Sequence, residues 1–159
     1  MDRNEFGVRA RLCQTRLYKI ALAILSQPYD AQDAVQDALI RAWENLPRLK
    51  NDAYFETWLT RILINRSREI LRERAAHPSQ EFSENMIGET QAAPDPDLRR
   101  ALEALDTRYR LPLVMRCVLD MPIAEVAKAL SVPYGVAKWR IHQAKKLAQK
   151  YLCEGGRKQ

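Results

Sequence analysis

The segment 123–151 constrains the fold more than any other part of the chain, because it joins two helical patterns through a three-residue turn. Over 123–130, the apolar residues recur at the i, i+3, i+4 and i+7 spacing of a helix with one buried face. The turn at 131–133 ends in Pro133, and a second helical pattern runs from Tyr134 to about Tyr151. This arrangement is typical of a helix-turn-helix motif.

The second helix of this motif has a small apolar face and a basic face. Its apolar residues, from Ala137 to Tyr151, repeat at spacings of three and four, which predicts that they are buried. The residues on the opposite side are Lys138, Trp139, His142, Gln143 and Lys146. A helix of this kind can lie in the major groove of duplex DNA, which is the expected partner. The alternative is an ordinary two-helix unit whose lysine face is only solvated.

The composition favours an all-α protein. The 159-residue chain holds only 5 glycines, and long stretches are rich in the strong helix formers Ala, Leu, Arg, Glu and Gln. Its 47% of hydrophobic residues suffice for one core or two small ones. No apolar run approaches the about 20 residues that span a bilayer, and the first residues lack the order of a signal peptide. We therefore expect a cytoplasmic protein.

Residues suited to catalysis or metal binding are sparse. The three cysteines, Cys13, Cys117 and Cys153, are widely spaced, which predicts reduced thiols and no disulfide framework or zinc site. The two histidines, His77 and His142, have no metal-ligand or catalytic-triad spacing to other residues, and no glycine-rich phosphate loop is present. We expect no enzyme activity, catalytic residue, metal, cofactor or small-molecule substrate.

Charge divides the chain into three parts. Residues 1–75 hold 13 Lys and Arg and 10 Asp and Glu. Residues 98–159 hold 13 Lys and Arg and only 5 Asp and Glu. Residues 76–97 between them hold 5 acidic residues and no Lys or Arg, together with three prolines and a glycine. This pattern predicts an N-terminal domain over 1–75, an acidic flexible linker over 76–97 and a C-terminal domain over 98–159. A solvated surface loop is the alternative, although 22 residues without structure are many for one compact domain.

The N-terminal domain has three predicted helices. The first runs from about 5 to 25 and stops before Pro28, and its expected buried residues are Val8, Leu12, Leu17, Ile20, Ala21 and Ile24. The second runs from an N-cap at Asp30 to Leu46, with an unbroken apolar stripe. The third runs from about 53 to 74.

The polar faces of the second and third helices are the candidate functional surfaces of this domain. The second helix displays Asp33, Gln36, Asp37, Arg41 and Glu44, a face that is either solvated or a protein contact. The third carries a stripe of Thr57, Arg61, Asn65, Arg68 and Arg72 beside the aromatic residues Tyr54, Phe55 and Trp58. Aromatic rings next to arginines suit exposed bases. The alternative is that Phe55, Trp58, Leu59 and Ile62 are simply core.

Two segments resemble conserved regions of bacterial sigma factors. The run Asp30-Ala-Gln-Asp-Ala-Val-Gln-Asp-Ala-Leu-Ile-Arg-Ala-Trp43, followed by Phe55-Glu-Thr-Trp-Leu-Thr-Arg-Ile62 and Asn65, resembles region two. The run Leu105-Asp-Thr-Arg-Tyr-Arg-Leu-Pro-Leu-Val-Met-Arg116, followed by 123–147, resembles region four. With these two regions and a short acidic linker, residues 8–151 resemble the extracytoplasmic-function (ECF) group of the sigma-70 family.

The resemblance implies three surfaces and several partners. Core RNA polymerase would bind through the clamp helices of its largest subunit to Asp33, Gln36, Asp37 and Arg41, and through the flap of its second-largest subunit. The minus-ten promoter DNA would be held by Lys50, Asn51, Tyr54, Arg61, Asn65, Arg68 and Arg72. The minus-thirty-five duplex would be contacted by Tyr134, Lys138, Trp139, Arg140, His142, Gln143, Lys145 and Lys146. An anti-sigma factor, with membrane anchoring left open, is a further implied partner, and a stress signal is the implied trigger.

The recognition helix departs from the pattern usual in the family. Val136 replaces a hydroxyl residue, Trp139 stands where a small residue is common, and Gln143 replaces a frequent arginine. Base preference therefore cannot be transferred from relatives: Trp139 could pack on a thymine methyl or on a partner protein, and Gln143 suits adenine. Two other functions stay open. One is a sigma-like module that sequesters an anti-sigma factor without starting transcription, and the other is a plain two-domain DNA-binding regulator.

Overall fold

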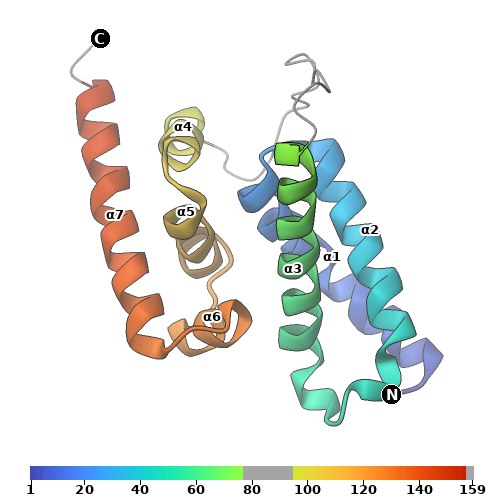
Figure 1. Ribbon diagram of the computed structural model, residues 1–159. Helices are drawn as coiled ribbons and strands as arrows, with labels where there is room; N and C mark the ends of the chain where they lie inside the picture. The colour runs from blue at the N-terminus through green and yellow to red at the C-terminus, as the bar shows by residue number, and fades with distance from the viewer. Residues whose placement is uncertain (77–94, 157–159) are drawn as a thin grey trace. The chain divides into compact units, whose positions relative to one another are not determined.

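The computed structural model describes residues 1–76 and 95–156. Within these ranges every regular element is helical, which confirms the all-α prediction (Figure 1). The chain divides into two compact units, Met1–Gly88 and Glu89–Gln159. The linker predicted at 76–97 lies largely outside the described residues. No described helix has both the length and the apolar composition needed to cross a membrane.

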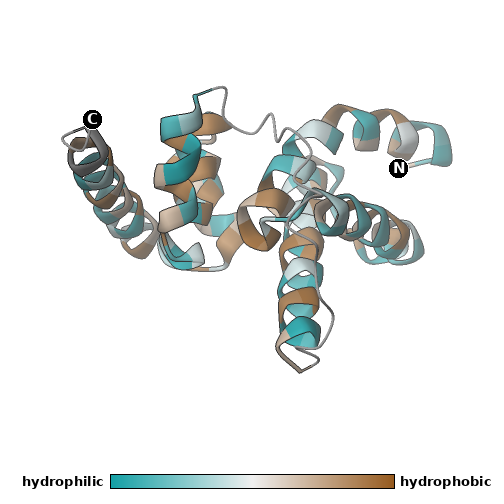
Figure 2. Ribbon diagram, turned by 90° about the horizontal axis from the view of Figure 1, so that it is seen from above, coloured by the Kyte–Doolittle hydropathy of each residue, from teal (hydrophilic) through white to brown (hydrophobic). Residues whose placement is uncertain are grey.

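Over residues 1–76, unit 1 is a bundle of three helices: α1 (Arg3–Leu25), α2 (Pro28–Glu44) and α3 (Phe55–Ala76). Each helix packs against the other two. Two short 3-10 turns, η1 (Leu46–Arg48) and η2 (Asp52–Tyr54), connect α2 to α3. Along the helices of both units, hydrophobic and hydrophilic residues alternate as amphipathic helices require (Figure 2). The residues at the centre of the unit 1 core are Leu17, Ile20, Phe55, Leu59, Leu63 and Ile64.

The buried face of α1 differs from the prediction in its first half. Val8 and Leu12 were expected in the core, but they are 58% and 80% exposed. Phe6, Ala10 and Cys13 are buried instead. The reason is the ring of Phe6, whose centroid lies 5.2 Å from that of Trp43 and 5.6 Å from that of Phe55. Phe6 shares one face of α1 with Ala10, Cys13, Leu17, Ile20 and Ile24 through spacings of three and four, so burying this aromatic ring leaves Val8 and Leu12 toward solvent.

The start of α2 also differs from the prediction. The helix begins at Pro28, with Gln27 as N-cap, so Asp30 is not the cap residue. Proline suits the first turn because its amide nitrogen has no hydrogen to leave unsatisfied, and its fixed φ is already helical. Asp30 lies inside that turn and forms an ion pair with Arg74 of α3. The helix ends at Glu44, two residues before the predicted end, and Trp43 is 39% exposed at its edge.

The described part of unit 2, residues 95–156, contains four helices and a π-helical turn. Its elements are α4 (Pro96–Ala104), α5 (Thr107–Leu113), η4 (Val114–Val118), α6 (Ile123–Leu130) and α7 (Tyr134–Gly156). Asp95 and Asp106 cap α4 and α5 by accepting hydrogen bonds from backbone N–H groups of the first turn. Pro112 lies inside α5, where it removes one helical hydrogen bond, and the helix continues as the π-helical turn η4.

The predicted helix-turn-helix motif is confirmed. Helix α6 ends at Ser131, which has the left-handed backbone conformation (φ 57°), and α7 begins at Tyr134. The backbone N–H of Val132 donates to the carbonyl of Ala127, which closes the turn. Ala137, Ile141, Ala144 and Ala148 of α7 are buried as predicted. Tyr151 was expected to be buried with them but is 41% exposed.

Candidate polymerase and promoter interface

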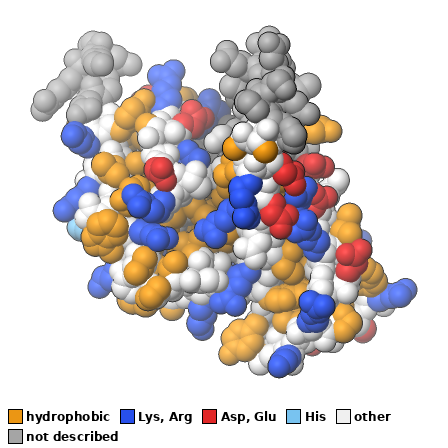
Figure 3. Space-filling model, viewed as in Figure 1, with side chains coloured by type: hydrophobic (Ala, Val, Ile, Leu, Met, Phe, Trp, Pro, Cys, Tyr) orange, Lys and Arg blue, Asp and Glu red, His pale blue; other side chains and the backbone are white. Residues whose placement is uncertain are grey.

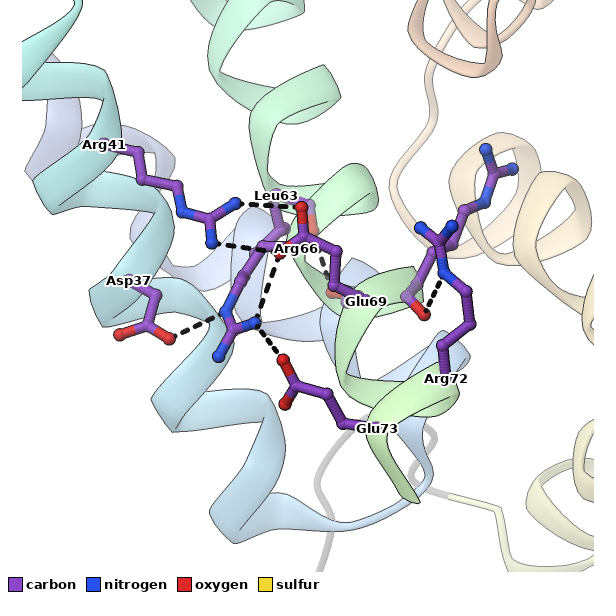
Figure 4. Close-up of polar contacts among 9 residues, drawn as sticks. Asp37, Arg41, Leu63, Arg66, Glu69, Arg72 and Glu73 are labelled. Atoms are coloured by element: carbon purple, nitrogen blue, oxygen red, sulfur yellow. Dashed lines mark hydrogen bonds and ion pairs between the residues drawn. The ribbon is translucent and has the colours of Figure 1, made fainter. Parts of the chain in front are cut away.

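Ion pairs connect α2 and α3 along one side of unit 1 (Figure 4). The Arg66 side chain of α3 donates from Nε to Asp37 Oδ2 (2.8 Å) and from Nη1 to Glu69 (3.2 Å) and Glu73 (3.2 Å). Arg41 of α2 donates to both oxygens of Glu69, at 3.2 and 2.9 Å. A fork of two parallel hydrogen bonds is the strongest geometry between arginine and a carboxylate. We call these five residues the seam cluster.

The charges in the seam cluster stabilise one another. Although partial burial opposes the charged form of Arg66, the hydrogen bonds to Asp37, Glu73 and Glu69 raise the pKa of its guanidinium. The pKa of Glu69 is lowered, chiefly because its carboxylate accepts the hydrogen bonds of Arg41 and also those of Arg66. Three carboxylates face two guanidinium groups, so the cluster carries a net charge of about −1.

The four residues predicted to bind polymerase fall into two pairs. Asp33 and Gln36 are exposed, as expected for a contact face. Asp37 and Arg41 are only partly exposed because they bond to α3. The sequence left open whether this face is solvated or a protein contact, and for Asp37 and Arg41 the observed contact is with α3 of the same chain. Arg66, Glu69 and Glu73 were missed, since periodicity does not tell which residues of two antiparallel helices stand opposite each other.

The predicted nucleic-acid stripe on α3 forms one exposed line. Arg61, Asn65, Arg68 and Arg72 are all exposed. They lie on the side of α3 opposite the buried residues Leu59, Leu63, Ser67 and Ile70. Nε of Arg72 donates to the backbone carbonyl of Arg68 at 3.4 Å. On the face drawn in Figure 3, acidic side chains gather near α2 and α3, while Lys and Arg are spread over both units.

The connection between α2 and α3 holds the other predicted minus-ten residues. Lys50 and Asn51 are exposed, and Tyr54 is 56% exposed. The side-chain oxygen of Asn51 accepts the N–H of Ala53 (3.0 Å), so it caps η2. A cavity of about 780 Å³ adjoins this connection. Its lining residues are Met1, Asp2, Arg3, Trp43, Glu44, Leu46, Pro47, Leu49 and Asp52.

Contacts from the start of the chain hold this connection in place. Arg9 donates to the Asp52 carbonyl at 2.9 Å, and the amino group of Met1 lies 3.3 Å from the Asp52 carboxylate. Phe55 is fully buried and Trp58 is partly buried, so the alternative that Phe55 is core is correct. Tyr54 is the aromatic residue of this segment that remains exposed enough to stack on a base.

The recognition helix α7 exposes most of its predicted DNA-contacting residues. Arg140 and Gln143 are partly exposed, at the edges of the face. The exposed residues are Tyr134, Lys138, Trp139, His142, Lys145 and Lys146. Trp139 is 53% exposed and also contacts its own protein, because its ring centroid lies 6.3 Å from that of Tyr109 in α5. The guanidinium of Arg108 lies over the Tyr109 ring at 4.8 Å. These two neighbours of the recognition helix were missed.

Unit 2 also has an apolar groove of about 240 Å³. Lys145 and Gln149 lie at this groove beside its apolar residues. The apolar residues are Leu98, Leu102, Leu113, Val118, Ala148 and Leu152, with Cys117 among them. Among the residues that the structure describes, no three His, Cys, Asp or Glu side chains are placed to hold a metal ion. His77 lies outside the described residues.

Two family models match the chain in the order of the two units. Sigma-70 region 2 matches residues 10–77, and Sigma-70, region 4 matches residues 96–147. The chain is 22% identical over 169 residues to the ECF RNA polymerase sigma factor SigW of Bacillus subtilis, covering 95% of this chain and 90% of that protein. It is 29% identical over 147 residues to the ECF RNA polymerase sigma factor SigM of Mycobacterium tuberculosis, and this match covers 91% of this chain and 75% of SigM.

Two solved structures share the fold. RpoE from Bartonella quintana, solved in complex with the anti-sigma factor NepR, gives a TM-score of 0.79 at 22% identity, covering 93% of this chain and 96% of that one. CnrH, solved with the cytosolic domain of CnrY, gives a TM-score of 0.72 at 23% identity, and the match covers 96% of this chain and 90% of CnrH. Both domain matches, in this order and over most of the chain, place the protein in the sigma-70 family of RNA polymerase sigma factors, and the relatives that align with most of the chain are ECF sigma factors.

Proposed function

We propose that this chain binds core RNA polymerase and directs it to promoters by contacting the minus-ten strand with unit 1 and the minus-thirty-five duplex with unit 2. The observation that supports this most strongly is the exposed Arg61–Asn65–Arg68–Arg72 line in the unit that matches region 2, together with an exposed basic recognition helix in the unit that matches region 4. A transcription initiation factor of this kind supplies recognition, and the polymerase supplies catalysis. We propose that it acts in the cytoplasm, beside the polymerase and the promoter DNA.

Asp33 and Gln36 are the centre of the proposed polymerase contact, because they are exposed on α2. The clamp helices of the largest subunit are the proposed partner. Asp37 and Arg41 border this contact while they bond to α3. The pair can bind a partner only by sharing or exchanging the hydrogen bonds that they already make.

The minus-ten strand is proposed to follow the exposed line of α3 and to place a base at the 46–54 connection. The arginines bind phosphates, and Tyr54 offers a ring for stacking. Lys50 and Asn51, both exposed, are proposed contacts at the same place. The cavity of about 780 Å³ beside them has room for a base turned out of the stack.

The minus-thirty-five duplex is proposed to receive α7 in its major groove. Lys138, Lys145 and Lys146 suit phosphates, whereas Trp139, His142 and Gln143 suit base edges. Tyr134 and Arg140 lie at the start and the edge of the same face. The contact of Trp139 with Tyr109 restricts its side chain, so Tyr109 takes part in positioning whatever contact Trp139 makes.

The apolar groove of unit 2 is proposed to bind the flap of the second-largest polymerase subunit or an anti-sigma factor. Its lining is predominantly leucine, valine and alanine, which suits an amphipathic partner helix. Structural relatives solved with the anti-sigma factor NepR and with CnrY support a partner of this class. Whether such a partner here is membrane-anchored, and which stress signal releases it, are further elements of the proposal.

The alternative function is a sigma-like module that sequesters an anti-sigma factor without starting transcription. Such a module would need the fold and the partner surfaces but no basic nucleic-acid surface. The exposure of Arg61, Arg68 and Arg72 in unit 1, and of Lys138, Lys145 and Lys146 in unit 2, favours the initiation factor. A plain two-domain DNA-binding regulator would not need Asp33 and Gln36.

The polymerase contact can be tested with two double variants. Asp33→Ala/Gln36→Ala should weaken binding to purified core polymerase about tenfold while the helix content stays unchanged, since both side chains are exposed. Asn4→Ala/Glu5→Ala removes the same two kinds of group from exposed positions of α1 and should bind normally. Binding would be measured by fluorescence anisotropy. Full affinity for the α2 variant would remove Asp33 and Gln36 from the interface.

A further inference from the structure

Two glutamates lie close to the proposed strand-binding line of α3. Glu69 and Glu73 each follow an arginine of that line, Arg68 and Arg72. Glu69 is also three residues before Arg72, a spacing at which a carboxylate and a guanidinium on one helix can meet. A carboxylate that turned toward the line would repel phosphates and occupy the arginine that should bind them.

The structure turns both carboxylates away from this line, toward the flank of α3 that faces α2. Glu69 accepts hydrogen bonds from Arg41 and Arg66, and Glu73 accepts one from Arg66 (Figure 4). Arg41 belongs to α2, and Arg66 of α3 also donates to Asp37 of α2, so these contacts gather the glutamates beside α2. Arg72 instead donates to the carbonyl of Arg68, so its guanidinium stays on the exposed line.

Arg66 is the member of the seam cluster that joins all three carboxylates. Its side chain is only 16% exposed, and its hydrogen bonds go to Asp37, Glu69 and Glu73. With so little exposure, its guanidinium is poorly placed to reach a phosphate itself. Without it, Asp37, Glu69 and Glu73 would face Arg41 alone, and the net charge of the cluster would fall from about −1 to about −2.

We propose that Arg66 is a positioning residue that holds Glu69 and Glu73 against α2 and so keeps Arg68 and Arg72 available to the promoter strand. The inference rests on the proposed function, because it assumes that a minus-ten strand binds along α3. In this proposal Arg66 supports strand binding through Glu69 and Glu73 and does not contact the DNA itself. It also links the strand-binding helix to Asp37, which borders the proposed polymerase contact.

The test compares variants of the full chain, each assembled with core polymerase, for binding a labelled single strand of a selected minus-ten sequence. Arg66→Met keeps the length of the side chain and removes its charge, and we expect about fivefold weaker strand binding. Arg66→Met/Glu69→Gln/Glu73→Gln should return to within about twofold of the parent, because the interfering carboxylates are gone. A purely structural role of Arg66 would not be restored by removing its partners.

Two further variants keep the test decisive. Arg16→Met removes an arginine that pairs with Glu56 (3.3 Å) between α1 and α3, and should leave strand binding unchanged. Arg66→Lys keeps the charge, but one ammonium group cannot reproduce the separate hydrogen bonds of Arg66 to Asp37, Glu69 and Glu73. A loss of about twofold is therefore expected, which provides a readout if Arg66→Met does not fold. Parental affinity in folded Arg66→Met, or no recovery in the triple variant, would overturn the inference. If the unaltered chain does not distinguish the selected strand from a random one, the proposed function fails first.

Discussion

Gln143 and Lys146 are one turn apart on α7, yet they are expected to contribute differently to DNA binding. Gln143→Ala should cost about 1–3 kcal/mol on the preferred minus-thirty-five duplex and little on random DNA, because an amide suits a base edge. Lys146→Ala should weaken binding to both duplexes equally and reduce the salt slope by about one phosphate contact. Two salt titrations on each duplex measure both effects. Equal losses for Gln143→Ala on the two duplexes would show that this side chain does not contact bases.

The three cysteines should separate by accessibility. Cys117 and Cys153 are exposed, whereas Cys13 is buried in unit 1 and burial raises the pKa of its thiol. The thiolate is the reactive form, so iodoacetamide should modify Cys117 and Cys153 first and Cys13 only after unfolding. Mass spectrometry of the native and the denatured protein gives the order. Rapid labelling of Cys13 in the native protein would contradict the α1 packing described above.

At the scale of the element, α1 shows how an amphipathic pattern can be assigned to the wrong face. Leu12 is 80% exposed and Leu17 is 1% exposed on the same helix. Leu17→Ala should therefore cost about 2–5 kcal/mol of unfolding free energy, because it leaves a cavity. Leu12→Ala should stay within about 0.5 kcal/mol. Urea denaturation measures the unfolding free energy of both variants. Similar losses for Leu12→Ala and Leu17→Ala would show that Leu12 is buried, as the sequence predicted.

The seam between α2 and α3 should make the stability of unit 1 depend on acid. The folded pKa of Glu69 is lowered, so its stabilising effect is complete above the ordinary glutamate value of about 4.3 and is lost as the pH falls through the lower folded value. The unfolding free energy should therefore fall less between pH 5 and pH 3 in Glu69→Gln than in the parent. Glu44→Gln, at an exposed position of α2, is the control. An unchanged acid dependence in Glu69→Gln would show that the ion pairs of Glu69 contribute nothing.

The sequence predicted whole elements better than the contacts between them. The bounds of α6, the turn and the start of α7 follow from local signals: apolar spacing, Pro133 and the alanine face. The exposed line of α3 follows from the same periodicity. The pairing of Arg66 with Asp37, and of Trp139 with Tyr109, depends on which residues face each other between helices. Periodicity carries no information on that register.

The predictions of the start of α2 and of the buried face of α1 were wrong for a related reason. Asp30 is a good N-cap residue, but the preceding Pro28 already satisfies the first turn. Val8 and Leu12 form a plausible stripe, but Phe6 contributes more buried area through its contacts with Trp43 and Phe55. In both cases a competing residue nearby decided the outcome.

At the scale of the whole molecule, the two proposed nucleic-acid surfaces would account for the excess basic charge of both units. Residues 1–75 and 98–159 each hold 13 Lys and Arg. Two moderate contacts on one promoter strengthen each other, because binding of one raises the local concentration of the other. The account therefore predicts that neither surface alone suffices for promoter recognition, and that both must act on a shared polymerase.

Run-off transcription with purified core polymerase tests the central claim most directly. Templates would come from sequences selected by the assembled complex, with core polymerase alone as the blank. We expect a transcript from a defined start, which is lost when Asp33→Ala/Gln36→Ala removes the polymerase contact and reduced when Arg61 and Arg68 are both changed to alanine. A chain that binds core polymerase or an anti-sigma factor but gives no specific transcript on any selected template would contradict the account, and the sequestering module would take its place.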